Sequence, residues 1–169
     1  YTRRMAHEEF DVRNPFVGIE GYQCFGCDPE NPIGLQLDFH RSGDTVSAQW
    51  EPRSELEGYP GVVHGGIQAT LCDELGGWYV YAVLGTAGVT RNLSIEYEKT
   101  ARVEDGPFRI TARGLERSPK SARIEVELRN RADERCARAE ITYAVFSEAV
   151  ARKRLFFPGP EAFRPSSGQ

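Results

Sequence analysis

Residues 58–77 read GYPGVVHGGIQATLCDELGG, and this stretch decides how the rest of the chain can fold. It passes from a loop rich in glycine and proline into a helix that we expect to span residues 66–84 and to end near Gly85. Apolar residues surround the axis of that helix, and a helix without a polar face is normally buried. The sequence therefore predicts one long central helix against which the other elements pack.

Alternating apolar residues on both sides of this helix predict strands. They lie near residues 35–39 and 46–50 before it, and near residues 93–97, 108–112, 122–128 and 136–147 after it. Hairpin-length links between the later strands imply antiparallel neighbours. We predict an α+β fold, an antiparallel sheet of five to six strands wrapped around one long central helix. The domain would span residues 24–147, between an irregular segment at 1–23 and a loosely packed tail at 148–169.

Composition and charge exclude several classes of protein. The 169 residues are 40% hydrophobic and carry a formal net charge of −4, so no global attraction to nucleic acid is expected. The most apolar stretch, residues 67–84, is interrupted by Asp73 and Glu74, which argues against a membrane span. Residues 1–23 contain no continuous apolar run like that of a signal peptide. We expect a cytoplasmic protein without nucleic-acid or membrane partners.

The two acids within the predicted helix are the first candidates for chemistry. A carboxylate costs several kcal/mol to bury without a partner, so at least one of Asp73 and Glu74 needs a reason to be there. Adjacent helical residues point about 100° apart, so at most one of them is expected to serve a given site. The alternative is that the helix emerges at an edge, where both acids are solvated.

The second candidate is His64-Gly65-Gly66 at the start of the helix. Two glycines there allow close approach to free backbone N–H groups, and the helix dipole favours negative charge at that end. Such a terminus can stabilise the oxyanion of a reacting carbonyl. A simple capping turn would account for the same three residues.

The spacing of the two candidates predicts how they combine. Asp73 lies seven residues after Gly66, which is about 10 Å along one helix. A reacting carbonyl needs its oxyanion donors and its attacking group each within roughly 3 Å, so one helix cannot easily supply both. A two-fold homodimer can, because the Gly66 end of one helix then faces the Asp73 region of the other. We expect a homodimer, or a homotetramer built from it, with two shared sites per dimer.

These motifs, with others along the chain, resemble those of the PaaI-like hotdog-fold acyl-CoA thioesterases. The resemblance covers about residues 24–147. It rests on CFGC at 24–27, NPIGL at 31–35, EGYPGVVHGG at 57–66, TLCDE at 70–74 and TRNLSIEY at 90–97.

The resemblance implies a role for each matching residue. Asp73 would be the general base or nucleophile, the Gly65 and Gly66 region would donate backbone N–H groups to the thioester oxygen, and Thr90 would help to position water. His64 would either hold the turn or touch the substrate. Some members carry an asparagine where this chain has Gly58, so one oxyanion-side donor is missing or replaced.

The hairpin at residues 117–121, RSPKS, resembles the place where relatives hold the phosphates of coenzyme A. Arg117 and Lys120 would make these contacts, although surface hairpins are commonly basic. Coenzyme A would be part of the substrate, and no other cofactor is expected.

Cys24 and Cys27 form a CxxC motif, for which zinc and redox roles have to be weighed. A structural zinc site needs two more ligands at close spacing, and a redox motif needs a βαβ context, and neither is evident. We favour a turn with buried thiols and predict no metal site.

The sequence thus predicts an acyl-CoA or acyl-carrier thioesterase. A hotdog hydratase would need a histidine beside the acid, and His64 is the only plausible one. A non-catalytic acyl-CoA-binding or assembly protein on the same fold is the stronger rival, because fold does not imply function.

Overall fold

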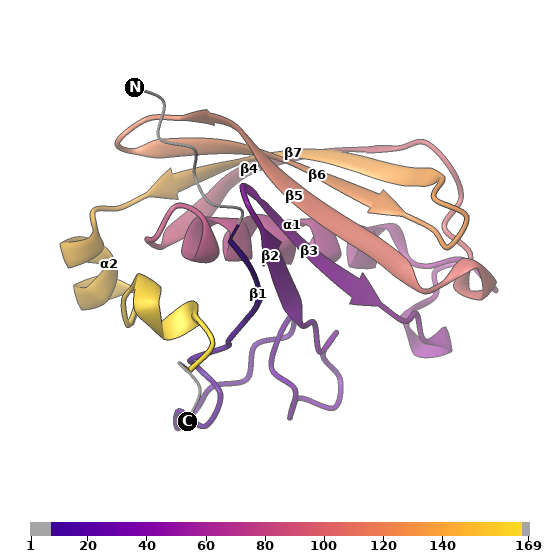
Figure 1. Ribbon diagram of the computed structural model, residues 1–169. Helices are drawn as coiled ribbons and strands as arrows, with labels where there is room; N and C mark the ends of the chain where they lie inside the picture. The colour runs from indigo at the N-terminus through magenta and orange to yellow at the C-terminus, as the bar shows by residue number, and fades with distance from the viewer. Residues whose placement is uncertain (1–7, 167–169) are drawn as a thin grey trace.

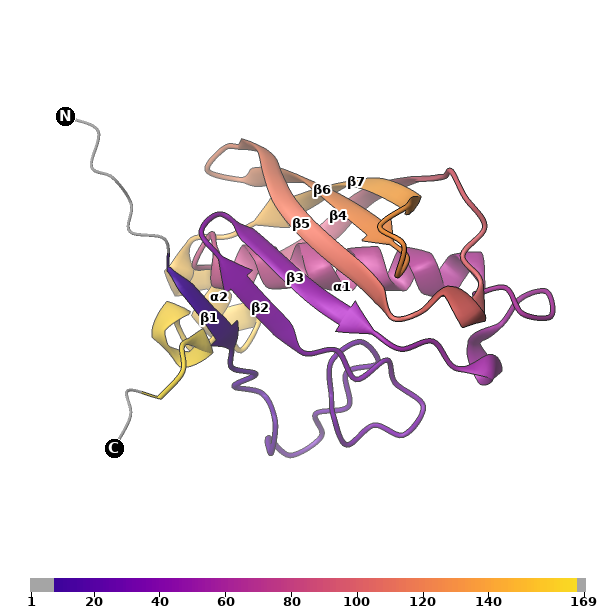
Figure 2. The same ribbon diagram turned by 45° about the vertical axis from the view of Figure 1, so that its right-hand side comes forward.

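One long helix lies along one face of a curved antiparallel sheet (Figures 1 and 2). The computed structural model describes residues 8–166. Helix α1 spans Gly65–Ala82 and follows the first three strands along the chain. Leu71, Leu75 and Trp78 on this helix are almost fully buried, as its apolar surroundings predicted. The predicted hotdog arrangement is confirmed.

The sheet has seven strands in the order β1-β2-β3-β5-β6-β7-β4. Because β4 follows α1 but pairs with β7, the chain crosses the sheet before it returns through β5, β6 and β7. The strands are β1 Glu9–Val12, β2 Phe39–Ser42, β3 Thr45–Trp50, β4 Gly88–Tyr97, β5 Phe108–Arg117, β6 Ser121–Arg129 and β7 Arg135–Val145. The shorter helices are α2 Glu148–Arg154 and the 3-10 turns η1 Ser54–Leu56, η2 Val103–Asp105 and η3 Pro160–Phe163.

The expected five to six strands are too few, because the segment at 1–23 contributes β1. This strand pairs antiparallel with β2, and only Val12 of its four residues is buried. Such a short, exposed strand carries little alternation for a sequence to reveal. The predicted strand at 35–39 also begins later, at Phe39, because the backbone of Gln36 has a φ of 54° and interrupts extension.

The expected loose tail is wrong as well. Phe157 and Phe163 are 2% and 1% exposed, and the Phe163 ring stacks on Tyr81 of α1 with 5.1 Å between centroids. Gly159, with a φ of 111°, allows the turn between these two phenylalanines. This segment contains several prolines but is packed, and it covers the C-terminal part of α1.

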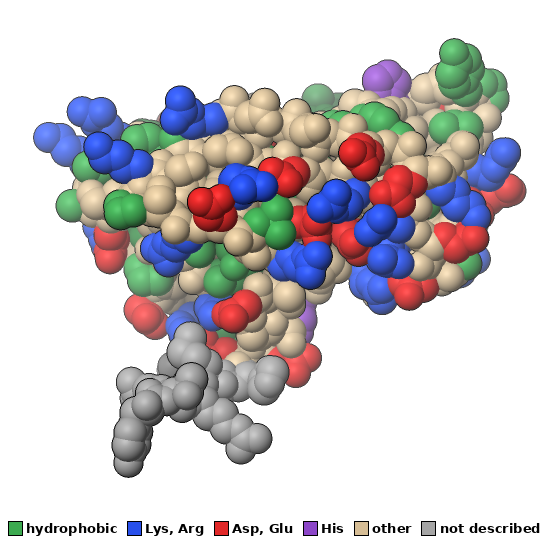
Figure 3. All heavy atoms as spheres, turned by 90° about the horizontal axis from the view of Figure 1, so that it is seen from above, with side chains coloured by type: hydrophobic (Ala, Val, Ile, Leu, Met, Phe, Trp, Pro, Cys, Tyr) green, Lys and Arg blue, Asp and Glu red, His purple; other side chains and the backbone are tan. Residues whose placement is uncertain are grey.

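The outer face of the sheet carries ion pairs rather than a basic stripe, and Figure 3 shows acidic and basic side chains interspersed over it. Glu125, only 3% exposed at its side chain, bonds Arg113 on β5 and Arg138 on β7. Burial alone would raise the pKa of Glu125, but hydrogen bonds from both guanidinium groups outweigh it and lower that pKa.

Within residues 8–166, none of the helices is both long enough and apolar enough to cross a membrane.

Candidate active site

Asp73 lies midway along α1, where the neighbouring strands β4 and β7 fix its position. Thr90 Oγ1 donates a hydrogen bond of 2.8 Å to Asp73 Oδ1. The Tyr143 hydroxyl lies 2.7 Å from the main-chain oxygen and 3.1 Å from Oδ1 of the same residue. Thr90 on β4 is the direct cross-strand partner of Tyr143 on β7, so the pairing of these two strands brings both hydroxyls to Asp73. Oδ2 of Asp73 has no hydrogen-bond partner among residues 8–166.

Sequence reasoning missed Tyr143 as a site residue and treated it as an alternating core position. Its side chain is 2% exposed, and its hydroxyl occupies space that any side chain at Gly76 would fill. Burial, followed by the nearby charge of Asp73, raises the pKa of Tyr143 and keeps it a neutral donor. The sequence feature that could have pointed to Tyr143 is Gly76, which lies three residues after Asp73 on the same face of the helix and leaves room for another side chain there.

A pocket of about 610 Å³ opens beside these groups. Its polar lining includes Asp73, Glu74, Thr90 and Tyr143. Its aromatic lining consists of Phe16, Tyr22, Trp78, Tyr81 and Phe156. The wall of this pocket is therefore built jointly by the N-terminal segment, α1, β4 and the C-terminal segment.

Glu74 faces the same pocket as Asp73, which corrects the expectation that the two acids serve different surroundings. Adjacent helical side chains point about 100° apart, and both of these side chains line the pocket. Glu74 accepts a hydrogen bond of 3.1 Å from Trp78 Nε1. Cys24 Sγ lies 3.5 Å from the same carboxylate oxygen.

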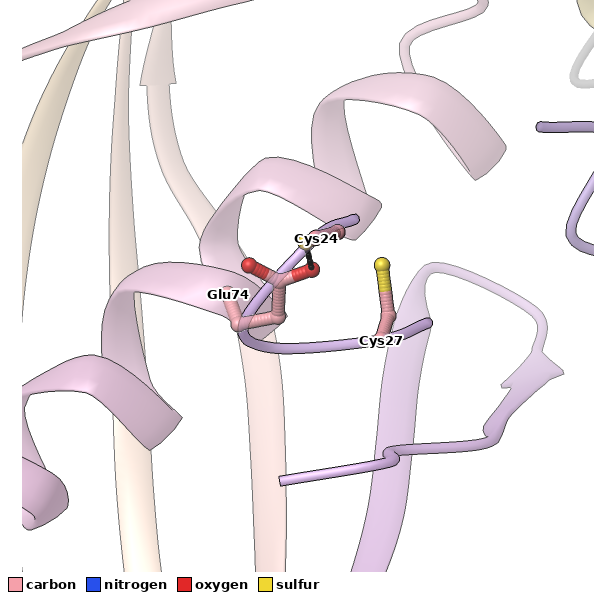
Figure 4. A group of neighbouring side chains, drawn as sticks. All are labelled: Cys24, Cys27 and Glu74. Atoms are coloured by element: carbon pink, nitrogen blue, oxygen red, sulfur yellow. Dashed lines mark hydrogen bonds between the residues drawn. The ribbon is translucent and has the colours of Figure 1, made fainter. Parts of the chain in front are cut away.

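Figure 4 shows the Cys24, Cys27 and Glu74 side chains gathered where the N-terminal loop crosses α1. The neighbouring Cys27 thiol is the chief cause that lowers the pKa of Cys24. The pKa of Cys27 is raised by its Cys24 neighbour and by burial. The prediction of buried thiols holds for Cys27, but Cys24 is only partly buried, and both thiols line the pocket.

His64 caps the helix, and this affects the predicted oxyanion donors. Its Nδ1 accepts a 2.9 Å hydrogen bond from the Gly66 N–H, so that donor is engaged. Within the part of the chain that the structure describes, the Gly65 N–H has no partner. The structure thus places His64 at the turn and leaves Gly65 as the available donor.

Gly58 adjoins this cap. A Cβ atom built on Gly58 would lie 3.3 Å from Cδ2 of the His64 ring. An asparagine here, as in some relatives, would crowd the imidazole in its capping position. The glycine and the histidine cap are therefore compatible features of the same turn.

Arg117 and Lys120 lie at the β5–β6 hairpin, and neither is among the residues that line the pocket. Ser118 closes the turn by accepting a 3.1 Å hydrogen bond from the Ser121 N–H. The hairpin lies at the same end of the sheet as Thr90, because Ser121 pairs with residue 144 of β7 and that residue pairs with 89 of β4. The structure brings together Asp73 and Thr90, and leaves these two cations outside that cluster.

Comparisons with known proteins bear on the family and the fold of this chain. The sequence model of the Thioesterase superfamily matches residues 60–137. A solved protein of Streptococcus mutans UA159 bound to acetyl-CoA is 26% identical over 62% of this chain and 83% of that chain, with a TM-score of 0.57. A hypothetical thioesterase of Streptococcus pneumoniae TIGR4 with coenzyme A is 27% identical over 62% and 83% of the two chains, with a TM-score of 0.59.

Zebra fish thioesterase superfamily member 2 shares the fold at 23% identity, with a TM-score of 0.61 over 69% of this chain and 89% of that chain. A comparison with curated proteins gives no match. Residues 60–137 thus resemble the Thioesterase superfamily, and the chain shares its hotdog fold with these solved proteins.

Proposed function

We propose that this protein hydrolyses an acyl-CoA thioester to a free acid and a thiol. The observation that carries the proposal is the Asp73 carboxylate in the pocket wall, with Oδ1 held by Thr90 and Tyr143. A carboxylate held by one oxygen can use the other as a base or a nucleophile. The match of residues 60–137 to the superfamily model, and the coenzyme A compounds bound to two similar structures, support this proposal.

The proposed chemistry uses Oδ2 of Asp73. This oxygen accepts a proton from water as the water attacks the thioester carbonyl carbon, and the carbonyl oxygen becomes negatively charged. Collapse of the tetrahedral intermediate breaks the carbon–sulfur bond, and the released thiolate takes up a proton. In the alternative route, Oδ2 itself attacks and forms an anhydride that water then hydrolyses. After a single turnover in ¹⁸O-labelled water, label in Asp73 would establish the anhydride route, because water attack on the aspartyl carbon of the anhydride leaves its oxygen there.

The oxyanion donor is proposed to come from a second copy of the chain. Gly65 and Asp73 are eight residues apart on one helix, about 12 Å, which is too far for one carbonyl to contact both. Strand β4 is ten residues long and lies at an edge of the sheet, so its outer side is available for pairing with another copy. In a two-fold homodimer, Asp73 of one subunit and the Gly65 N–H of the partner subunit would form one site. Two such dimers could assemble into a tetramer.

We propose a separate place for each half of the substrate. Its aromatic lining suits an apolar acyl group, with aromatic acyl groups foremost because rings pack favourably on rings. Arg117 and Lys120 on the β5–β6 hairpin would bind phosphates of coenzyme A. We therefore propose a panel of aromatic, short-chain and long-chain acyl-CoA substrates to define the acyl specificity.

The decisive experiment compares Asp73→Asn with the wild type by release of free thiol from that panel. We expect turnover to fall by at least about 100-fold, with the fold unchanged by circular dichroism. Asp44→Asn, at an exposed turn residue between β2 and β3, is the matched control. Near wild-type turnover of Asp73→Asn would refute the assignment.

Acyl-CoA binding without hydrolysis is the second candidate function. Two observations favour it, namely Gly58 at a position where some relatives have asparagine, and the Gly66 N–H that His64 already engages. Tight binding of acyl-CoA in calorimetry, together with no thiol release across the panel, would establish this function instead.

A further inference from the structure

A second cluster of chemically active side chains lies in the same pocket as Asp73. It consists of Cys24 and Cys27 from the N-terminal loop and Glu74 from α1. One ligand atom from each lies within 4.8 Å of the other two (Figure 4). Two thiols and a carboxylate this close together are a donor set that zinc accepts.

The distances fit a tetrahedral metal. With Zn–S near 2.3 Å and Zn–O near 2.1 Å, the edge between a sulfur and an oxygen ligand is about 3.6 Å, and that between two sulfurs is about 3.8 Å. Cys24 Sγ and Glu74 Oε1 are 3.5 Å apart. That separation matches the sulfur–oxygen edge, and the other two pairs lie within 4.8 Å, so the three ligands are close enough to surround one ion after a modest contraction.

The groups around the cluster hold its members in place. Gly26, between the cysteines, has no side chain, and the Glu74 carboxylate occupies the space that one would fill. Trp78 Nε1 donates a 3.1 Å hydrogen bond to Glu74 Oε1. The Tyr22 hydroxyl lies 3.0 Å from Cys27 Sγ. Such outer contacts orient ligands in metal sites.

We propose that Cys24, Cys27 and Glu74 bind one Zn²⁺ ion and leave its fourth position open to the pocket. Three protein ligands with one open position are the arrangement of zinc sites that bind water or substrate. The open position faces the pocket because all three ligands line it. Sequence spacing could not reveal the third ligand, since Glu74 is 47 residues beyond Cys27.

The ion would have a structural consequence. The N-terminal loop contributes Tyr22, Cys24 and Cys27 to the pocket, and the metal would tie that loop to α1. Metal binding is then expected to stabilise the folded protein. This inference is independent of thioester hydrolysis, because the site would bind metal whether or not Asp73 is catalytic.

The test is titration of chelator-treated, reduced protein with Co²⁺ and then with Zn²⁺. We expect one Co²⁺ per chain, with sulfur-to-cobalt charge-transfer absorption and the visible bands of a tetrahedral ion, and displacement by Zn²⁺. Cys24→Ser and Cys27→Ser should abolish the charge-transfer absorption stepwise. Glu74→Gln should keep the sulfur bands and weaken Zn²⁺ affinity by more than about 100-fold, since loss of an outer contact alone costs about 10- to 100-fold.

Cys136→Ala is the matched control, because Cys136 is a buried thiol on β7 outside the cluster. It should retain the full spectrum. The proposal is overturned if the reduced wild type shows no charge-transfer absorption, or if Cys24→Ser and Cys27→Ser keep it. Should a cysteine variant fail to fold, Glu74→Gln decides the question, and unchanged Zn²⁺ affinity in that variant refutes the three-ligand site.

Discussion

Thr90 Oγ1 lies 2.8 Å from Asp73 Oδ1, so a residue near the start of β4 fixes one oxygen of a carboxylate carried by α1. The strand and the helix are consecutive elements of the chain, and the hydrogen bond joins them at the wall of the pocket. The free oxygen of Asp73 therefore has a defined direction before any substrate enters, which is the form of preorganisation that favours catalysis.

Replacing Thr90 by valine removes this hydrogen bond and retains the shape of the side chain. A hydrogen bond to a charged group contributes about 1.5–3 kcal/mol, so we expect turnover to fall about 10- to 100-fold with a smaller change in KM. Steady-state kinetics on the best acyl-CoA would measure both. Thr90→Ser keeps the hydroxyl and should retain most activity, and equal losses in the two variants would contradict the role.

The Gly65 N–H can be removed almost selectively. Gly65 is the first residue of α1, where proline is well accepted, and the preceding His64 has a ψ of 136° that suits a following proline. We expect Gly65→Pro to fold and to lose about 100- to 1,000-fold in turnover. Gly65→Ala keeps the N–H and makes the same Cβ contact with the Tyr97 ring, so it serves as the control.

Mixing subunits tests whether that donor acts across a dimer. Subunits of Asp73→Asn and Gly65→Pro should each be nearly inactive alone. Random reassociation would create one intact site in half of the dimers and restore about one quarter of wild-type activity. No recovery, in a mixture shown by mass spectrometry to contain heterodimers, would place both groups in one subunit.

Stability should depend on pH through Glu125. Its pKa is lowered in the folded protein, so its stabilising effect is complete above the unfolded pKa of about 4.3 and is lost as pH falls through the lower folded value. At neutral pH we expect Glu125→Gln to lower the free energy of unfolding by about 1–2 kcal/mol. Denaturant titrations from pH 7 to pH 3 should show this difference shrinking below about pH 4.

Glu104→Gln is the control for that series, because Glu104 is exposed and forms no ion pair within residues 8–166. It should leave the unfolding curve almost unchanged at every pH. A constant difference between Glu125→Gln and the wild type down to pH 3 would show that the ion pairs of Glu125 contribute nothing.

The C-terminal segment should contribute to stability through Phe163. This ring is 1% exposed and stacks on Tyr81, so we expect Phe163→Ala to cost about 3–5 kcal/mol in chemical denaturation. Phe156→Ala, at a ring that is 83% exposed, should cost much less. Equal and small effects of the two substitutions would mean that the segment is dispensable for folding.

The sequence could predict the features that depend on local pattern. The helix and its glycine-rich start follow from composition and periodicity within one short stretch, and the structure moves the predicted bounds by only one residue at the start and two at the end. The long strands β5, β6 and β7 alternate clearly because one face is buried and the other carries charges. The sequence also indicated Asp73, since a charge in an apolar helix is conspicuous.

What the sequence could not predict depends on contacts between distant residues. Tyr143 looks like any core tyrosine until the sheet register places it beside Thr90. Glu74 joins Cys24 and Cys27 only because the N-terminal loop crosses α1. Strand β1 needs β2 as a partner and has too little alternation of its own. In each case the sequence does not reveal which surface a distant segment of the chain covers.

The two edges of the sheet limit how many further strands can be added to it. At one edge, β1 has four residues and exposes Glu9 and Asp11, whose charges disfavour the addition of another strand. At the other edge, β4 has ten residues, and pairing with its own copy would use up the whole length. In the proposed dimer, growth of the sheet in the hydrogen-bonding direction would therefore stop at two copies, and the exposed edge of β4 would be protected from further strand addition.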